Sequence, residues 1–269
     1  IYFGAYGKTT SNYVWGNFYR LSLRSGSSYR TIASLTNSNI ENAVNLSTFK
    51  TGNYQPPVFA APAFTSDYVG NLWVFFGTGK FLNNEDKSIP YTNYLIGYKD
   101  PYWNSTGPAR SKGDLVDVRT VLSTTTTPYL TENECICDNS GCSFRDFTYY
   151  KTQLSGTVTV TNGWYYSLTG EAIISQPFLY AEMVNSLVFI PPGDICEYTG
   201  RTRYVSLYYN LLYEPNTTII IDQIIGYGAP PLGQPFQALP SGKLIVQTSA
   251  GTIIKLPTPT VLAQGKFVT

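Results

Sequence analysis

The sequence contains no histidine, and this absence says more about function than any catalytic motif does, because it rules out several classes of enzyme. Without histidine, the chain lacks the usual general base of Ser-His-Asp and Cys-His catalysis and the commonest neutral metal ligand. The closest carboxylate pairs, Asp114 with Asp117 and Glu132 with Glu134, remain as candidates for acid-base chemistry. Acidic residues this close together usually lie in solvated loops, so we expect no catalytic residues and no enzymatic activity.

Charged residues and long apolar runs are also scarce. Charged side chains make up 13% of the residues and the net charge is +1, which provides no basic patch to neutralise the phosphates of a nucleic acid. The sequence also contains no apolar run of about 18 residues, the length that a membrane-spanning helix needs. We therefore expect neither a nucleic-acid partner nor a membrane span.

The residues that are abundant favour β-structure. The chain has 23 tyrosines and 14 phenylalanines, and aromatic residues suit the half-buried surface of a strand. Helix signals are nearly absent. The best of them is the segment 39–44, for which we predict one or two helical turns.

A short pattern recurs along the chain, in which a Gln-Pro dipeptide precedes two apolar segments of strand-like sequence. The dipeptides are Gln55-Pro56, Gln176-Pro177 and Gln234-Pro235. The predicted strand pairs are 72–76 with 94–98, 187–190 with 203–208, and 244–246 with 252–256. Because such a unit cannot bury its apolar face alone, copies must pack side by side, and we predict an all-β fold of the β-propeller type.

The ends and the insertion set the expected domain organisation. A further hairpin, 1–4 with 18–23, has no Gln-Pro dipeptide before it, so we expect the chain to begin within a blade of a longer polypeptide. Residues 1–260 then form part of one propeller, with about three and a half blades, and 261–269 form a tail. The long interval between the first two dipeptides predicts a large insertion at about 100–163, in which the Thr-rich run 123–128 forms an exposed connection.

The four cysteines are Cys135, Cys137, Cys142 and Cys196. Residues two apart bond poorly, so we expect either Cys135 or Cys137 to join Cys142 while the other joins Cys196. That arrangement would tie the insertion to the following blade. A four-cysteine zinc site is the alternative, although the usual paired C-x-x-C sequences are missing. Disulfides would place the chain in an oxidising, extracytoplasmic compartment.

Loops on a rigid propeller are the expected place for partner recognition. We predict that the insertion carries it, through aromatic side chains that can anchor a partner. These candidates are Tyr102, Trp103, Tyr129, Phe144, Phe147, Tyr149 and Tyr150.

An ordered set of short motifs extends across nearly the whole chain. The motifs are 74–82, 94–100, 114–116 with 120–121, 163–168 with 170–171, 175–177, and 189–196, which reads Phe-Ile-Pro-Pro-Gly-Asp-Ile-Cys. In their order and approximate spacing they resemble the C-terminal β-propeller of the PilC/PilY family of type IV pilus-associated adhesins.

The resemblance implies a secreted, non-catalytic protein at the pilus tip or outer cell surface. Its implied roles are surface attachment and support of pilus assembly or resistance to retraction. The implied partners are minor pilins or the pilus-tip complex, and a host or abiotic surface. In the family a calcium loop commonly precedes the hairpin that matches 1–23, so we expect calcium only upstream of Ile1 and no cofactor within this sequence.

Two other functions are compatible with the sequence. A carbohydrate-binding propeller independent of pili would stack exposed tyrosines and tryptophans on sugar rings. A quinoprotein dehydrogenase would need a buried catalytic aspartate, calcium ligands and a tryptophan that stacks on the cofactor, for which Trp73, Trp103 and Trp164 are the candidates.

Overall fold

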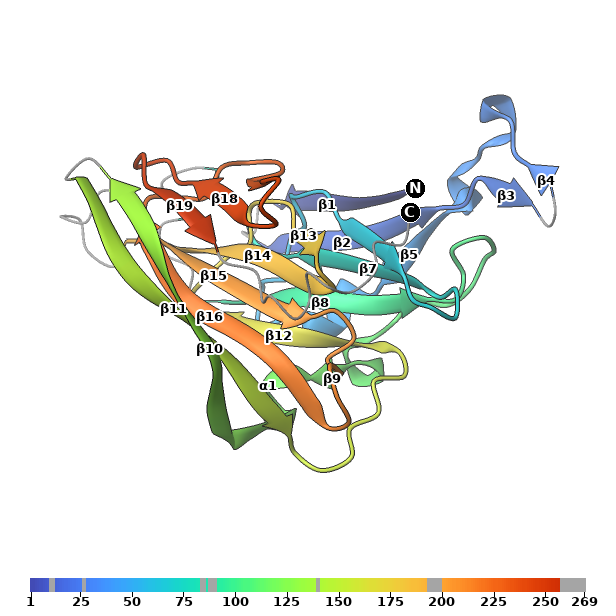
Figure 1. Cartoon of the computed structure of the whole chain (residues 1–269). Helices are drawn as coiled ribbons and strands as arrows, with labels where there is room; N and C mark the ends of the chain where they lie inside the picture. The colour runs from blue at the N-terminus through green and yellow to red at the C-terminus, as the bar shows by residue number, and fades with distance from the viewer. Residues whose placement is uncertain are drawn as a thin grey trace.

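The computed structural model describes residues 1–9, 13–25, 28–82, 86, 91–138, 141–192 and 200–256. These residues form successive sheets that pack against one another, with antiparallel strands except for the parallel pair at 116–117 and 164–165 (Figure 1). The predicted all-β architecture of the propeller type is confirmed. Each predicted strand pair is also found, because the strands that contain the predicted segments pair over 72–77 with 95–100, 183–190 with 201–208, and 244–247 with 253–256.

The N-terminal sheet has the strand order β1-β2-β5. Its strands are β1 (Tyr2–Lys8), β2 (Val14–Leu21) and β5 (Ile40–Val44), with a small ribbon of β3 (Arg24–Ser25) and β4 (Ser28–Tyr29) beside them. The 3-10 helices η1 (Ile32–Ser34), η2 (Asn37–Asn39) and η3 (Leu46–Phe49) complete this region. The helix predicted at 39–44 is wrong, because Ala43 and Val44 bury their side chains as part of a strand that pairs with β2.

The second sheet has the order β6-β7-β8-β12-β9. Its strands are β6 (Ala63–Ser66), β7 (Leu72–Gly77), β8 (Thr92–Asp100), β12 (Gly163–Thr169) and β9 (Val116–Asp117). The 3-10 helix η5 (Lys112–Asp114) and the one-turn helix α1 (Val118–Val121) flank β9.

The third sheet is continuous over nine strands in the order β13-β14-β15-β16-β11-β10-β19-β18-β17. One half consists of β13 (Phe178–Tyr180), β14 (Met183–Ile190), β15 (Arg201–Tyr208) and β16 (Thr217–Tyr227). The other half consists of β17 (Phe236–Ala238), β18 (Leu244–Gln247) and β19 (Ile253–Leu256). The long hairpin of β10 (Leu122–Asp138) and β11 (Gly141–Leu154) lies between the two halves.

The hairpin formed by most of the predicted insertion therefore joins the two halves of the third sheet. Strand β11 pairs with β16 over 150–153, and β10 pairs with β19 at Ile136 and Cys137 (Figure 1). The Thr-rich run 123–128, predicted as a connection, lies within β10 although most of its side chains are exposed. The hairpin covers the outer edges of two sheet units, which would otherwise present unpaired backbone groups.

The second sheet is buried on both faces, which explains the unbroken apolar sequence of β7. Trp73 and Phe75 belong to the larger core cluster, whereas Val74 and Phe76 belong to the cluster shared with the N-terminal sheet. Successive strand residues point to opposite faces, so a strand packed on both sides must be apolar at every position. This sheet therefore packs between two neighbours, as a propeller blade does.

The glutamines of the repeated dipeptide connect neighbouring units. Gln55 donates from Nε2 to the Gly16 carbonyl oxygen, and Gln176 donates from Nε2 to the Pro62 carbonyl oxygen at 3.1 Å. Gly16 allows this close approach, since a Cβ there would lie 2.2 Å from the Pro56 carbonyl oxygen. In the third copy Gln234 is exposed.

A buried ion-pair network joins the N-terminal sheet to the second sheet. Nη1 of Arg20 lies 2.7 Å from both carboxylate oxygens of Asp100, and its Nη2 lies 2.7 Å from Oε2 of Glu41. The Tyr2 hydroxyl donates to Asp100 at 2.7 Å. The side chains of Arg20 and Asp100 are 2% and 1% exposed, so each charge depends on the other for its stabilisation.

We expect Asp100→Asn to lower the free energy of unfolding by about 3 kcal/mol, because it leaves the Arg20 charge buried with less compensation. The control is Glu214→Gln, which breaks the more exposed pair with Lys151 and should cost less than about 1 kcal/mol. Urea denaturation of both variants measures the difference. Equal losses in the two variants would contradict a stabilising role of the buried network.

Alkaline pH should destabilise the protein through its buried tyrosines. Burial raises the pKa of Tyr98 and Tyr204 above the usual 10.0 and raises that of Tyr165 to about 12. Because the folded chain holds these protons more tightly than the unfolded chain, the stability they contribute is complete below pH 10 and declines as the pH rises above it. We expect the urea midpoint to fall between about pH 8 and pH 11.

Tyr98→Phe provides the matched test of this dependence. The Tyr98 hydroxyl is buried without a hydrogen-bond partner among the described residues. The variant should therefore be at least as stable as the wild type at about pH 8 and should lose less stability at about pH 11. Tyr68→Phe, at a 95% exposed side chain, should not change the pH profile.

Candidate functional site

Three of the seven aromatic residues predicted to bind a partner are well exposed. The exposed fractions are 47% for Trp103, 73% for Phe144 and 39% for Tyr150. Trp103 follows β8, whereas Phe144 and Tyr150 belong to β11. No ring contact joins these side chains to one another in the described part of the chain, so they offer separate anchors on the surface.

The other four candidates are held within the protein. Tyr102 is half-buried, with its ring centroid 5.7 Å from the guanidinium carbon of Arg20, and Tyr129 packs at the edge of the larger core cluster. Phe147 and Tyr149 are 1% and 0% exposed and belong to that cluster. A partner-binding role is therefore wrong for Phe147 and Tyr149, because alternate residues of β11 point into the core.

The carboxylates considered for acid-base chemistry form salt bridges or hydrogen bonds within the protein. Glu132 and Glu134 both bind Lys243 in salt bridges. Burial alone would lower the pKa of Lys243, but its bonds to these carboxylates raise it. These contacts hold β10 to the segment between β17 and β18.

The second carboxylate pair caps two short helices. Asp114 accepts hydrogen bonds from the Ser111 backbone and hydroxyl at 2.7 and 2.8 Å, and these bonds lower the pKa of Asp114. Asp117 accepts a hydrogen bond from the Arg119 backbone at 3.1 Å. The two carboxylates therefore stabilise local turns.

Two of the three tryptophans considered for stacking on a quinone cofactor are buried. Trp73 and Trp164 are 1% and 0% exposed and pack within the larger core cluster. Nε1 of Trp164 donates to the Tyr209 carbonyl oxygen at 2.8 Å. Neither ring has a free face for a cofactor, so this prediction is wrong for Trp73 and Trp164.

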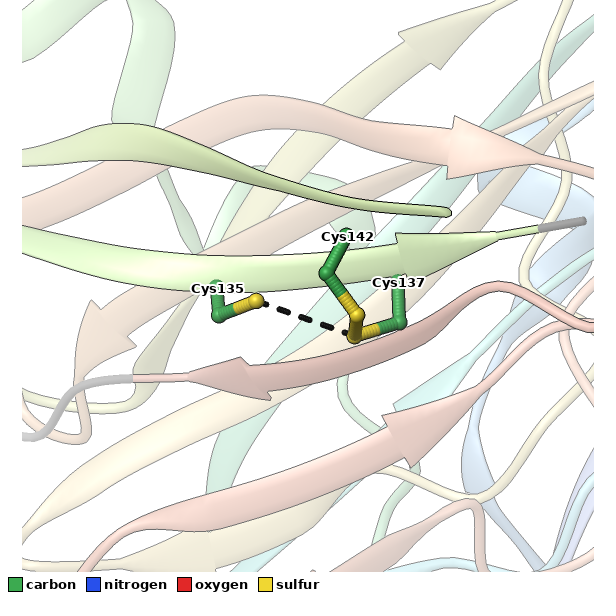
Figure 2. The surroundings of a disulfide bond; sticks show 3 residues. All are labelled: Cys135, Cys137 and Cys142. Carbon is green, nitrogen blue, oxygen red and sulfur yellow. Dashed lines mark hydrogen bonds between the residues drawn. A yellow bond between two sulfur atoms is a disulfide. The ribbon is translucent and has the colours of Figure 1, made fainter. Parts of the chain in front are cut away.

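The cysteines gather at the end of the β10–β11 hairpin (Figure 2). Cys137 and Cys142 form a disulfide, which confirms one of the predicted alternatives, and Cys135 is a free thiol. The Cys135 sulfur lies 3.7 Å from that of Cys137. Cys196 lies outside the described residues, and because Cys135 is a free thiol, the predicted bond between Cys135 and Cys196 is not formed.

Sequence reasoning missed an apolar pocket formed by segments next to all three Gln-Pro dipeptides. Its volume is about 170 Å³. It is lined by Phe59, Ala60, Ala61, Phe81, Leu82, Ile174, Leu232 and Gly233. The Gln176 backbone N–H donates to the Gly233 carbonyl oxygen at 2.7 Å, which brings two of these segments together. The recurrence of the Gln-Pro dipeptide was the one sequence feature that could have predicted this pocket, because equivalent connections of repeated units meet on one side of a propeller.

Among the described residues, no helix has the length and apolar character needed to cross a membrane.

Neither a protein-family model nor a curated protein matches the sequence. Among solved structures, the chain is similar to the C-terminal domain of Pseudomonas aeruginosa PilY1, with a TM-score of 0.52 and 15% sequence identity. The match covers 95% of this chain and 60% of the PilY1 chain. At this identity the similarity establishes a shared fold, which confirms the resemblance to the PilC/PilY propeller at the level of architecture.

The two faces of β11 should respond differently to truncation. We expect Phe147→Ala to lower the free energy of unfolding by about 3 to 5 kcal/mol, because it opens a cavity in the core. Phe144→Ala, three residues away on the opposite face of the strand, removes a 73% exposed side chain and should change it by less than about 0.5 kcal/mol. Denaturant unfolding of both variants tests the assignment, and a large loss for Phe144→Ala would show that its ring is packed in solution.

Proposed function

We propose that this chain is the propeller region of a non-catalytic, type IV pilus-associated protein that acts at the pilus tip. Its functions are attachment to a host or abiotic surface and support of pilus assembly or resistance to retraction. The observation that carries the proposal is the similarity of fold to the PilY1 C-terminal domain across 95% of the chain. The ordered motifs that resemble the PilC/PilY family support the same assignment.

The chemistry of the chain is consistent with an extracellular location. The disulfide between Cys137 and Cys142 suits an oxidising compartment. The carboxylate pairs considered for catalysis are engaged in caps and salt bridges, which favours a binding protein over an enzyme. Calcium, in this proposal, binds upstream of Ile1.

The proposed contacts with a surface are made by Trp103, Phe144 and Tyr150. Each is a large aromatic side chain, held on β11 for Phe144 and Tyr150 and in the turn after β8 for Trp103, and this anchoring limits the entropy lost on binding. Minor pilins or other components of the tip complex are the proposed partners for assembly.

The experiment is immunogold electron microscopy combined with an attachment assay, in cells that produce the protein from its own gene. We expect label at the ends of sheared fibres. The variant Trp103→Ala/Phe144→Ala/Tyr150→Ala should keep fibre number and label unchanged while attachment falls by about tenfold or more. The control Tyr29→Ala/Tyr68→Ala removes two other exposed rings, 77% and 95% exposed, and should attach normally.

The outcomes separate the components of the proposal. Label confined to the cell envelope, with none on fibres, would contradict the pilus assignment and favour an independent carbohydrate-binding propeller. Fibre-end label with normal attachment of the triple variant would retain the pilus location and reject these three residues as the contact surface.

A further inference from the structure

Three cysteine sulfurs converge on one face of the β10–β11 hairpin. Cys135 and Cys137 are two residues apart on β10 and therefore point to the same side of the strand. The antiparallel register places Cys142 opposite Cys137 and Phe144 opposite Cys135. All three sulfur atoms lie within 4.8 Å of one another (Figure 2).

The backbone that holds these cysteines is well fixed. Each cysteine lies in the hydrogen-bonded ladder of the hairpin, and Cys137 also pairs with Ile253 of β19. Cys142 is exposed, whereas Cys135 and Cys137 are half-buried. A cation in solution can therefore reach the cluster without any rearrangement of the sheet.

The spacing of the sulfurs matches that of metal thiolates. With zinc-sulfur bonds of about 2.3 Å, two thiolates of a tetrahedral site lie about 3.8 Å apart. The sulfurs of Cys135 and Cys137 are 3.7 Å apart without being bonded. The Cα atoms of Cys137 and Cys142 are 3.9 Å apart, so the Cys142 sulfur stays close to the other two when its disulfide is broken.

We propose that reduction of the Cys137–Cys142 disulfide creates a three-thiolate site for a thiophilic divalent cation of the zinc type. An external dithiol supplies two electrons and two protons, which convert the disulfide into two thiols, and the dithiol itself becomes a disulfide. The cation then displaces the protons of Cys135, Cys137 and Cys142, and water occupies the fourth position.

The surroundings favour a soft cation over calcium or magnesium. Glu132 and Glu134 of β10 alternate with the cysteines, so they point to the opposite face, where they bind Lys243. The described cluster thus offers sulfur ligands alone, which select zinc and similar metals. In the oxidised state the described cluster keeps one thiol, that of Cys135, and one thiol is too few to hold the cation.

The test uses Co²⁺ as a spectroscopic substitute for zinc, with the whole chain reduced by a phosphine and desalted without oxygen. We expect one Co²⁺ per reduced chain, with a sulfur-to-cobalt charge-transfer band in the near ultraviolet that disappears when Zn²⁺ is added. The oxidised protein should show no such band. Cys135→Ser and Cys142→Ser should each lower the affinity for Co²⁺ at least about tenfold.

The controls distinguish a site from general thiol binding. Cys135→Ser leaves the disulfide intact when oxidised, so its unfolding curve in that state should match the wild type and exclude a folding defect. Cys196→Ser should bind Co²⁺ as the wild type does. The absence of a charge-transfer band in the reduced wild type, an unchanged affinity for Co²⁺ in Cys135→Ser, or a requirement for Cys196 would each overturn the proposal.

Discussion

The pairing of exposed strand edges is the constraint on which this architecture depends. The strands β16 and β19 end two separate sheet units, and without partners each would present a row of unpaired backbone groups. The β10–β11 hairpin pairs with both and joins the units into one nine-stranded sheet. The hairpin, which the sequence predicts as an insertion between repeated units, is therefore a structural element of the fold. Its inward side chains, Phe147 and Tyr149, are part of the core.

Polar contacts between sheets determine how the units fit together. Apolar packing alone tolerates small shifts of one sheet across another, whereas the Arg20–Asp100 pair and the bonds of Gln55 and Gln176 each require one alignment. The repeated glutamine therefore has a physical explanation. In the first two copies it lies at a junction where the backbone of the preceding unit presents a carbonyl oxygen that needs a donor, whereas Gln234 of the third copy is exposed.

Local sequence was sufficient to predict the strand pairs, because alternation and turn residues are encoded within each hairpin. Prediction from local sequence failed where contacts between residues far apart in the chain determine the structure. The segment 39–44 became a strand through burial of Val44 beside Phe18, and Phe147 became a core residue through the register of a 14-residue strand that sequence alone did not reveal. The disulfide was predicted as one of two alternatives, but the approach of Cys135 to within 3.7 Å of Cys137 depends on strand geometry. The pocket beside the Gln-Pro segments required knowledge of which connections meet in space.

The bridging hairpin also determines how the molecule carries mechanical load. The β11–β16 contact extends over four residue pairs, whereas the β10–β19 contact extends over two. Tension that separates the two sheet units therefore acts first on the shorter ladder, and the Cys137–Cys142 bond prevents the adjacent hairpin end from opening with it. Rupture would begin between β10 and β19 and release the C-terminal unit, while the hairpin itself and the sheet that contains β16 remained folded.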